Sequence, residues 1–116
     1  KVKNQRADKV RGVMSVTDRI TEHLKKIDLR HGYMYLVARD LGYSVPNLDK
    51  KLRAEGSHYR DLLDAERRRR VSILLSHSPE SSKPSVAKAA GYSVNSIGHA
   101  MRRWFDMSLT SFRRQA

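Results

Sequence analysis

The four residues Gly-Tyr-Ser-Val occur twice in this chain, at 42–45 and 91–94, so the two copies lie 49 residues apart (91 − 42). Behind each copy, apolar residues follow at the spacing of one face of an α-helix. They are Leu48 and Leu52 in the first copy, and Ile97 and Met101 in the second. The repeat predicts a helix, a turn at glycine and a second helix, formed twice along the chain.

Other residues of the repeat suit this arrangement. Ser44 and Ser93 directly precede the second helices, where a serine side chain can cap the helix N-terminus, and Ser57 is predicted to cap the next helix in the same way. Ala38 and Ala87 stand four residues before each glycine, and a small side chain there lets two helices pack closely. A helix, a glycine turn and a capped helix are typical of the helix-turn-helix, whose second helix enters the major groove of DNA.

Helical spacing continues through the rest of the chain, and no alternating strand pattern occurs. We therefore predict an all-α fold with about seven helices, in which two helix-turn-helix subdomains are joined by a long linker helix. The predicted helices span about 10–27, 33–41, 45–54, 58–75, 84–90, 94–105 and 109–114. The predicted divisions are a basic lead-in at 1–12, the first subdomain at 13–56, the linker helix at 57–75 and the second subdomain at 76–116.

The charge of the chain favours an anionic partner. Its 116 residues include 24 Lys and Arg against 12 Asp and Glu, a net charge of +12. Such self-repulsion does not stabilise a small fold, but it attracts a polyanion, so nucleic acid is the first candidate partner and an anionic membrane surface the second. No apolar run is long enough to span a bilayer, and we predict no membrane partner.

Motifs of catalytic and metal sites are missing from the sequence. The five histidines form neither an HExxH motif nor a pair four residues apart, and there is no cysteine to provide a thiolate ligand. There is also no Walker loop, no GxSxG motif and no carboxylate pair in a recognisable motif. We therefore predict that the chain is not an enzyme and needs no metal and no cofactor.

Three stretches together resemble the AraC/XylS family of bacterial transcriptional regulators, over residues 13–114. They are VARDLGYSVPNLDKKLRAEGSHYRDLL, ERRRRVSILL and VAKAAGYSVNSIGHAMRRWFDMSLTSFRR. The resemblance implies a cytoplasmic, nucleoid-associated activator that places two recognition helices in successive major grooves of promoter DNA and acts with RNA polymerase. The stretch KKLRAEGSHYRDLL is similar to family members that activate virulence genes. Asp106 stands where the family has a late glycine.

The resemblance also implies which residues contact DNA. The base-reading positions fall on Pro46, Asp49 and Lys50 in the first recognition helix and on Val94, Asn95, Gly98 and His99 in the second. Lysine can donate to guanine, aspartate can accept from cytosine, and asparagine can pair with adenine. Phosphate contacts are expected from Ser44, Lys51, Arg53, Ser93, Arg102 and Arg103. Helix capping alone would equally explain the two serines.

Several side chains are expected to have structural roles. Arg67 lies on the apolar stripe of the linker helix, and we predict that it pairs with a carboxylate inside the domain. The next three arginines are predicted to form a solvated face, because consecutive helical residues point in different directions. Tyr59, Trp104, Phe105 and Phe112 have the spacing of core residues.

Two other functions fit the same sequence. A basic helical chain could bind nucleic acid without sequence preference, or it could be an interaction module that docks a chaperone or RNA polymerase. Because the sequence starts with Lys1 instead of Met, we expect a longer protein. Its remaining part would sense a signal, dimerise or bind a partner.

Overall fold

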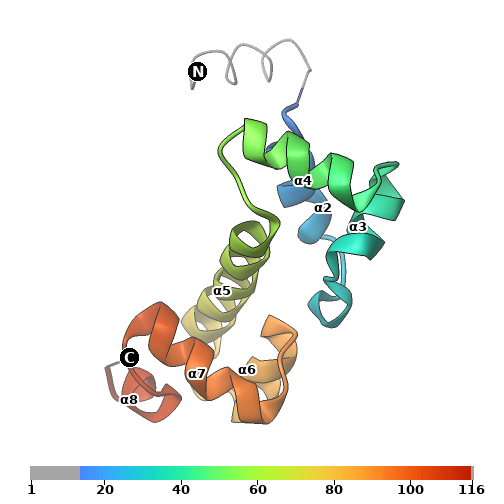
Figure 1. The fold of residues 1–116 in the computed structure, drawn as a ribbon. Coiled ribbons are helices and arrows are strands. Elements are labelled where there is room, and N and C mark those ends of the chain that lie inside the picture. Colours follow the sequence, from blue (N-terminus) through green and yellow to red (C-terminus); the bar gives the residue numbers. More distant parts are fainter. Residues whose placement is uncertain (1–13, 116) are drawn as a thin grey trace. The chain divides into compact units, whose positions relative to one another are not determined.

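The structure, a computed structural model, describes residues 14–115, and these form helices and no strands. The predicted all-α fold is confirmed. The elements are α2 (Val16–Leu24), the 3-10 turn η1 (Leu29–His31), α3 (Met34–Leu41), α4 (Val45–Ala54), α5 (Tyr59–His77), α6 (Lys83–Ala90), α7 (Val94–Phe105) and α8 (Leu109–Gln115) (Figure 1).

The described residues group into two compact units. Unit 1 comprises 14–27 and 32–64, and unit 2 comprises 28–31 and 65–115, so α5 begins in unit 1 and ends in unit 2. The start of the predicted 10–27 helix lies outside the described residues. Its predicted end is wrong, because α2 stops at Leu24, after which the Lys26 N–H closes a tighter turn on the His23 carbonyl (3.0 Å).

Unit 1 is built around the helices on either side of the first repeated turn. Gly42 ends α3 with a φ of 82°, in the left-handed region, and the Ser44 side chain accepts a hydrogen bond from the Asn47 N–H, as the sequence predicted. The core of this unit consists of Ile20, Leu24, Val37, Ala38, Leu48, Leu52 and Tyr59. The Tyr59 hydroxyl donates to the Gly32 carbonyl at 2.7 Å.

A carboxylate from the end of α4 caps the start of α2. The Glu55 oxygens accept from the N–H groups of Val16 (2.9 Å) and Thr17 (2.8 Å), which are unpaired donors at the first turn of any helix. The Thr17 hydroxyl donates to the same carboxylate at 2.5 Å and lies 3.0 Å from the Ser57 hydroxyl. The prediction that Ser57 caps α5 is therefore wrong, because this helix begins two residues later, at Tyr59, and the serine helps to hold α2 instead.

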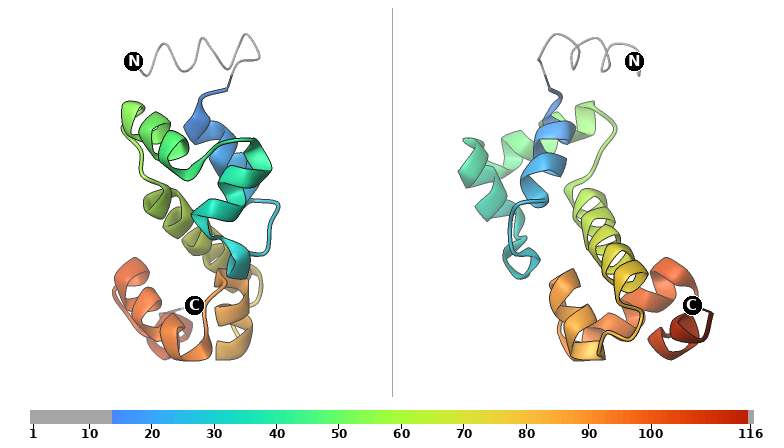
Figure 2. Two further views of the ribbon diagram at one scale, coloured as in Figure 1. Left: turned by 45° about the vertical axis from the view of Figure 1, so that its right-hand side comes forward. Right: turned by 180° about the vertical axis from the view of Figure 1, so that it is seen from behind.

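Unit 2 repeats the arrangement around the second turn. Gly91 ends α6 with a φ of 78°, and Ser93 caps α7 through the Ser96 N–H. The second half of α5 lies with α6, α7 and α8 in this unit (Figure 2). Their side chains form one core, which consists of Val71, Leu75, Val86, Ala87, Ala90, Ile97, Ala100, Met101, Trp104 and Leu109. Phe105 and Phe112 are half-buried against it, with their ring centroids 5.1 Å apart, so the four predicted core aromatics all pack in a core.

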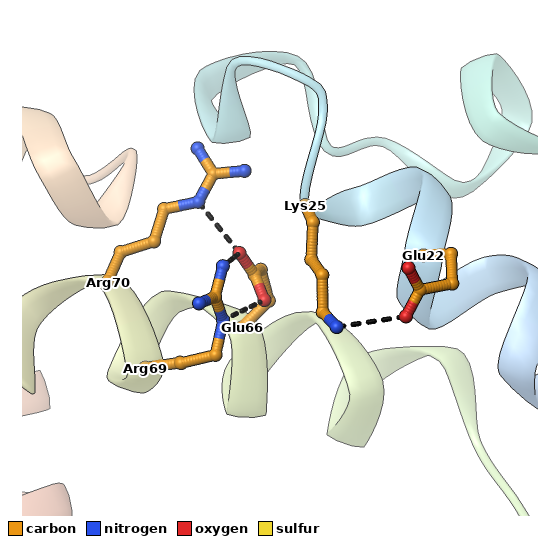
Figure 3. A network of polar contacts seen from close by, with 5 residues as sticks. All are labelled: Glu22, Lys25, Glu66, Arg69 and Arg70. Carbon is orange, nitrogen blue, oxygen red and sulfur yellow. Dashed lines mark hydrogen bonds and ion pairs between the residues drawn. The ribbon is translucent and has the colours of Figure 1, made fainter. Parts of the chain in front are cut away.

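The arginine run of α5 differs from the prediction. The buried carboxylate is Glu66, which accepts from Arg69 Nε (2.8 Å) and Arg70 Nε (2.9 Å), and Figure 3 shows both guanidinium groups reaching it. Arg67 contacts the Gly91 carbonyl (3.4 Å) and the ring of Tyr92 instead of a carboxylate. The prediction was wrong for Arg67 because the helix places Glu66, and not Arg67, at the buried position, with the two arginines three and four residues later on the same side.

The Glu66 carboxylate makes the stability of unit 2 depend on pH. Burial raises the pKa of this carboxyl, but the hydrogen bonds and charges of Arg69 and Arg70 lower it more, so its pKa in the fold lies below the usual value. Because the pKa of Glu66 is lower in the fold than in the unfolded chain, the ionised carboxylate stabilises the fold at pH values above the unfolded-state pKa. This contribution is lost as the pH falls through the folded-state pKa.

We expect Glu66→Gln to lower the free energy of unfolding at pH 7 by about 1–2 kcal/mol, at the lower end for a charged hydrogen bond because Arg69 is half exposed. Urea unfolding followed by Trp104 fluorescence should show the difference between wild type and variant shrinking below about pH 4. A difference that stays constant between pH 7 and pH 3 would contradict the role of the ionised carboxylate.

Candidate nucleic-acid interface

The outward face of α4 carries the side chains expected to read bases. Leu48 and Leu52 are fully buried, and because successive residues turn by about 100°, Lys50 lies on the opposite side of the helix. Lys50 is exposed, as are Pro46 before it and Arg53 after it. A basic helix face with a buried apolar back is therefore open to a partner of unit 1.

Two predicted contact residues of α4 pair with each other. The Arg53 Nε donates to Asp49 Oδ2 at 2.8 Å, as an i,i+4 ion pair. Both side chains are substantially exposed, so the pair contributes little to stability, but it neutralises part of the charge of Arg53. Lys51 is exposed on the other flank of the helix.

The outward face of α7 has the same construction. Ile97 and Met101 are buried, while Asn95, His99 and Arg102 are exposed on the other side of the helix. These three residues stand 49 positions after Pro46, Lys50 and Arg53. The two repeats therefore present equivalent positions of their second helices, and of these three pairs only Arg53 and Arg102 are the same residue.

The remaining predicted residues of α7 lie beside this face. Val94 is 43% exposed at the start of the helix. Gly98 is half-buried, and a Cβ added to it would meet open space. The Arg103 Nη2 donates to the Tyr92 hydroxyl at 3.5 Å, and its guanidinium lies 5.5 Å from the centre of the Trp104 ring. Arg103 is thus held against the body of unit 2.

The two capping serines have partners within their own helices. Ser44 accepts from the Asn47 N–H and Ser93 from the Ser96 N–H, both at 3.2 Å. The Ser93 hydroxyl also donates to the Ser96 hydroxyl at 2.9 Å. Capping is therefore their role in this structure, and phosphate contact by either serine stays a prediction.

Sequence reasoning missed an arginine that packs on the tyrosine of each repeat. The Arg19 Nη1 donates to the Tyr43 hydroxyl at 2.7 Å, and its guanidinium lies 5.4 Å from the centre of that ring. In the second repeat the Arg67 guanidinium lies 4.2 Å from the centre of the Tyr92 ring. Each tyrosine directly precedes the capping serine, so a cation–π contact fixes the turn that starts each second helix.

The described residues contain no group of three or more histidine, aspartate or glutamate side chains placed to hold a metal ion. Nor does any helix in residues 14–115 combine the length and apolar character needed to cross a membrane.

Comparisons with known proteins identify relatives by structure alone. No protein-family model matches the chain. No curated protein matches it by sequence either.

Three solved structures share the fold. A DNA-binding transcriptional dual regulator from Escherichia coli K-12 is 26% identical with a TM-score of 0.76, covering 87% of this chain and 91% of that one. The C-terminal domain of AraT, a response regulator from Geobacillus stearothermophilus, is 21% identical with a TM-score of 0.77, covering 87% and 85%. The transcriptional regulator CdpR from Pseudomonas aeruginosa is 31% identical with a TM-score of 0.75 over 85% of this chain, which spans 31% of that protein. The chain therefore has the all-α helix-turn-helix fold of bacterial transcriptional regulators.

Proposed function

We propose that this chain binds double-stranded DNA in a sequence-specific manner, as the DNA-binding part of a bacterial transcriptional regulator of the AraC type. The observation that carries the proposal is the duplicated second helix. Both α4 and α7 are capped by serine, bury an apolar back and expose a polar face with arginine at the equivalent position. The fold shared with a DNA-binding regulator and the net charge of +12 support the same function.

The proposal gives each exposed side chain a role. Lys50 and Asn95 contact base edges, with Pro46, Asp49, Val94, Gly98 and His99 beside them. The residues that contact phosphate are Ser44, Lys51, Arg53, Ser93, Arg102 and Arg103. The chain then acts as a non-enzymatic, cytoplasmic activator that works with RNA polymerase, under the control of a regulatory or dimerisation domain, or of a partner protein, outside these residues.

Binding by both helices predicts which stretches of the DNA are protected. In this proposal the 13–56 and 76–116 subdomains each insert one recognition helix into a major groove. Hydroxyl-radical footprinting on a selected site should show two protected stretches on one face of the duplex, about 10–10.5 base pairs apart. Protection of a single stretch would mean that one of the two helices does not enter a groove.

We expect Lys50→Ala to weaken binding to the selected site by about 1–3 kcal/mol, as for a lost base contact, and to weaken binding to scrambled DNA much less. Arg102→Ala should weaken binding to both duplexes alike, because a phosphate contact carries no sequence information. Competition assays of both variants at fixed salt measure these ratios.

Equal proportional losses for Lys50→Ala on the two duplexes would contradict base reading by α4. That result would favour the alternative of a basic protein that binds nucleic acid without sequence preference. Asn95→Ala applies the same test to α7.

A further inference from the structure

Each unit has a pocket at the same place in the repeat. The unit 2 pocket, of about 240 Å³, is lined by residues that include Lys83, Gly98, Arg102, Ser108, Thr110 and Arg113. The unit 1 pocket, of about 440 Å³, is lined by Met34, Asp49, Tyr59 and Asp61, together with His58 and Arg60. Met34 and Asp49 stand 49 residues before Lys83 and Gly98. Beyond the second helices the offset is 50, because the left-handed residues Gly56 and Asp106 are 50 apart and α5 and α8 begin 50 apart. His58 and Arg60 therefore correspond to Ser108 and Thr110. The two pockets are therefore equivalent, and their side chains can be compared position by position.

The comparison shows opposite electrostatic character. In unit 1 two carboxylates, Asp49 and Asp61, line the pocket. In unit 2 glycine replaces Asp49, the counterpart of Asp61 is Ser111 and lies outside the lining, and Lys83 replaces an uncharged methionine. The unit 2 pocket consequently has three cationic side chains and no acidic one in its lining. Since the two pockets share one backbone arrangement, the fold does not require this charge pattern.

The cations of the unit 2 pocket lack anionic partners. None of the ion pairs formed among residues 14–115 involves Lys83, Arg102 or Arg113. Arg113 is held in place by a hydrogen bond from its Nη2 to the Ser81 carbonyl. Its Nε is buried and has no hydrogen-bond partner among the described residues. Arg113 therefore brings to the pocket lining a positive charge that no carboxylate of residues 14–115 neutralises.

We propose that the unit 2 pocket binds a phosphate group, held by Lys83, Arg102 and Arg113 with the Ser108 and Thr110 hydroxyls as further donors. The volume is several times the roughly 30 Å³ share of one water molecule, which leaves room for a small tetrahedral anion. Gly98 keeps the pocket open, because no side chain fills the space beside it. The bound group is either a phosphate of the DNA backbone or a free phosphate ion from solution. In the first case the inference rests on the proposed function.

Titration with inorganic phosphate tests the free form. The intact chain is titrated at constant ionic strength and followed by calorimetry, with chloride as the control anion. We expect saturable binding that weakens about tenfold or more in Lys83→Met, which removes one charged donor. Lys83 is exposed at the first position of α6, and methionine occupies the equivalent place in unit 1, so this variant should fold. Arg113→Gln should act in the same direction.

Arg60→Gln is the matched control, because it removes an arginine from the equivalent pocket of unit 1 and should leave phosphate binding unchanged. The backbone form is tested by the salt dependence of DNA binding, where Lys83→Met should flatten the slope of log K against log salt by about one and Arg60→Gln should not.

The outcomes separate the two sources. If wild type binds free phosphate and Lys83→Met weakens that binding, the site is supported. This holds even if wild type binds no DNA, because failure to bind DNA would contradict only the proposed function. A flattened DNA slope without binding of free phosphate assigns the site to the DNA backbone. The inference is overturned if Lys83→Met and Arg60→Gln behave alike in both measurements.

Discussion

The affinity of this chain for DNA should fall by roughly 10³–10⁵ between 50 and 200 mM salt, as expected when about 6–10 phosphates are neutralised. The net charge of +12 is available for such contacts, and both second helices expose arginine and other polar side chains on one face. Each neutralised phosphate releases counterions from the duplex, and salt opposes that release. Fluorescence anisotropy with a labelled duplex across this salt range gives the slope directly.

The same titration on scrambled DNA is the control. If the electrostatic contacts are shared, both duplexes should have nearly the same slope, and the preferred site should keep its advantage at every salt concentration. A flat response to salt on both duplexes would contradict phosphate contact altogether. It would favour the alternative in which the helices dock a protein partner.

The local features of the fold were predictable from the sequence because they depend on neighbouring residues. A glycine that ends a helix and a serine that caps the next one act within a few positions, and both repeats show them at Gly42, Ser44, Gly91 and Ser93. The burial of Leu48 and Ile97 follows from helical spacing in the same way. The exposed faces of α4 and α7 are the consequence of these local rules.

Features that depend on tertiary contacts were not predictable. The partners of Arg19 and Glu55 are distant in sequence, so no spacing rule could identify them. The exchange of roles between Glu66 and Arg67 reflects a shift of one residue on a helix, which decides which side chain is buried. The conformation of Asp106 was also not predictable, since this residue ends α7 with a φ of 58°, in the left-handed region that glycine usually occupies.

The charge reversal between the two pockets was likewise hidden in the sequence. The alignment of the repeats was available from Gly42 and Gly91, but a pocket lining becomes known only when α6, α7 and α8 are placed around it. Arg113 shows this most clearly, since it reaches the lining from the last helix and is held there by the carbonyl of Ser81, 32 residues earlier.

The two repeated glycines should respond very differently to alanine. Both have a positive φ, which costs an L-residue about 1–2 kcal/mol, and this is the whole expected effect of Gly42→Ala, because a Cβ there meets open space. At Gly91 a Cβ would lie 2.6 Å from the Leu29 carbonyl carbon and 2.7 Å from its Cβ. Overpacking adds about 1–3 kcal/mol, so we expect Gly91→Ala to destabilise unit 2 by about 2–5 kcal/mol.

The turn that contains Leu29 is held by burial of the Leu29 side chain and by hydrogen bonds within the turn. The Asp28 carboxylate accepts from the Arg30 backbone N–H (2.9 Å) and from its Nη2 (2.6 Å), and the side-chain bond from Arg30 holds the pKa of Asp28 well below its usual range. Urea unfolding followed by the fluorescence of Trp104, the chain's one tryptophan, should report the loss of unfolding free energy in Gly91→Ala. For Gly42→Ala, unfolding is followed by circular dichroism. Leu29→Ala should not rescue Gly91→Ala, because the contacts involve the Leu29 backbone and Cβ. Equal losses at the two glycines, or rescue by Leu29→Ala, would show that this turn does not pack on Gly91 as the structure describes.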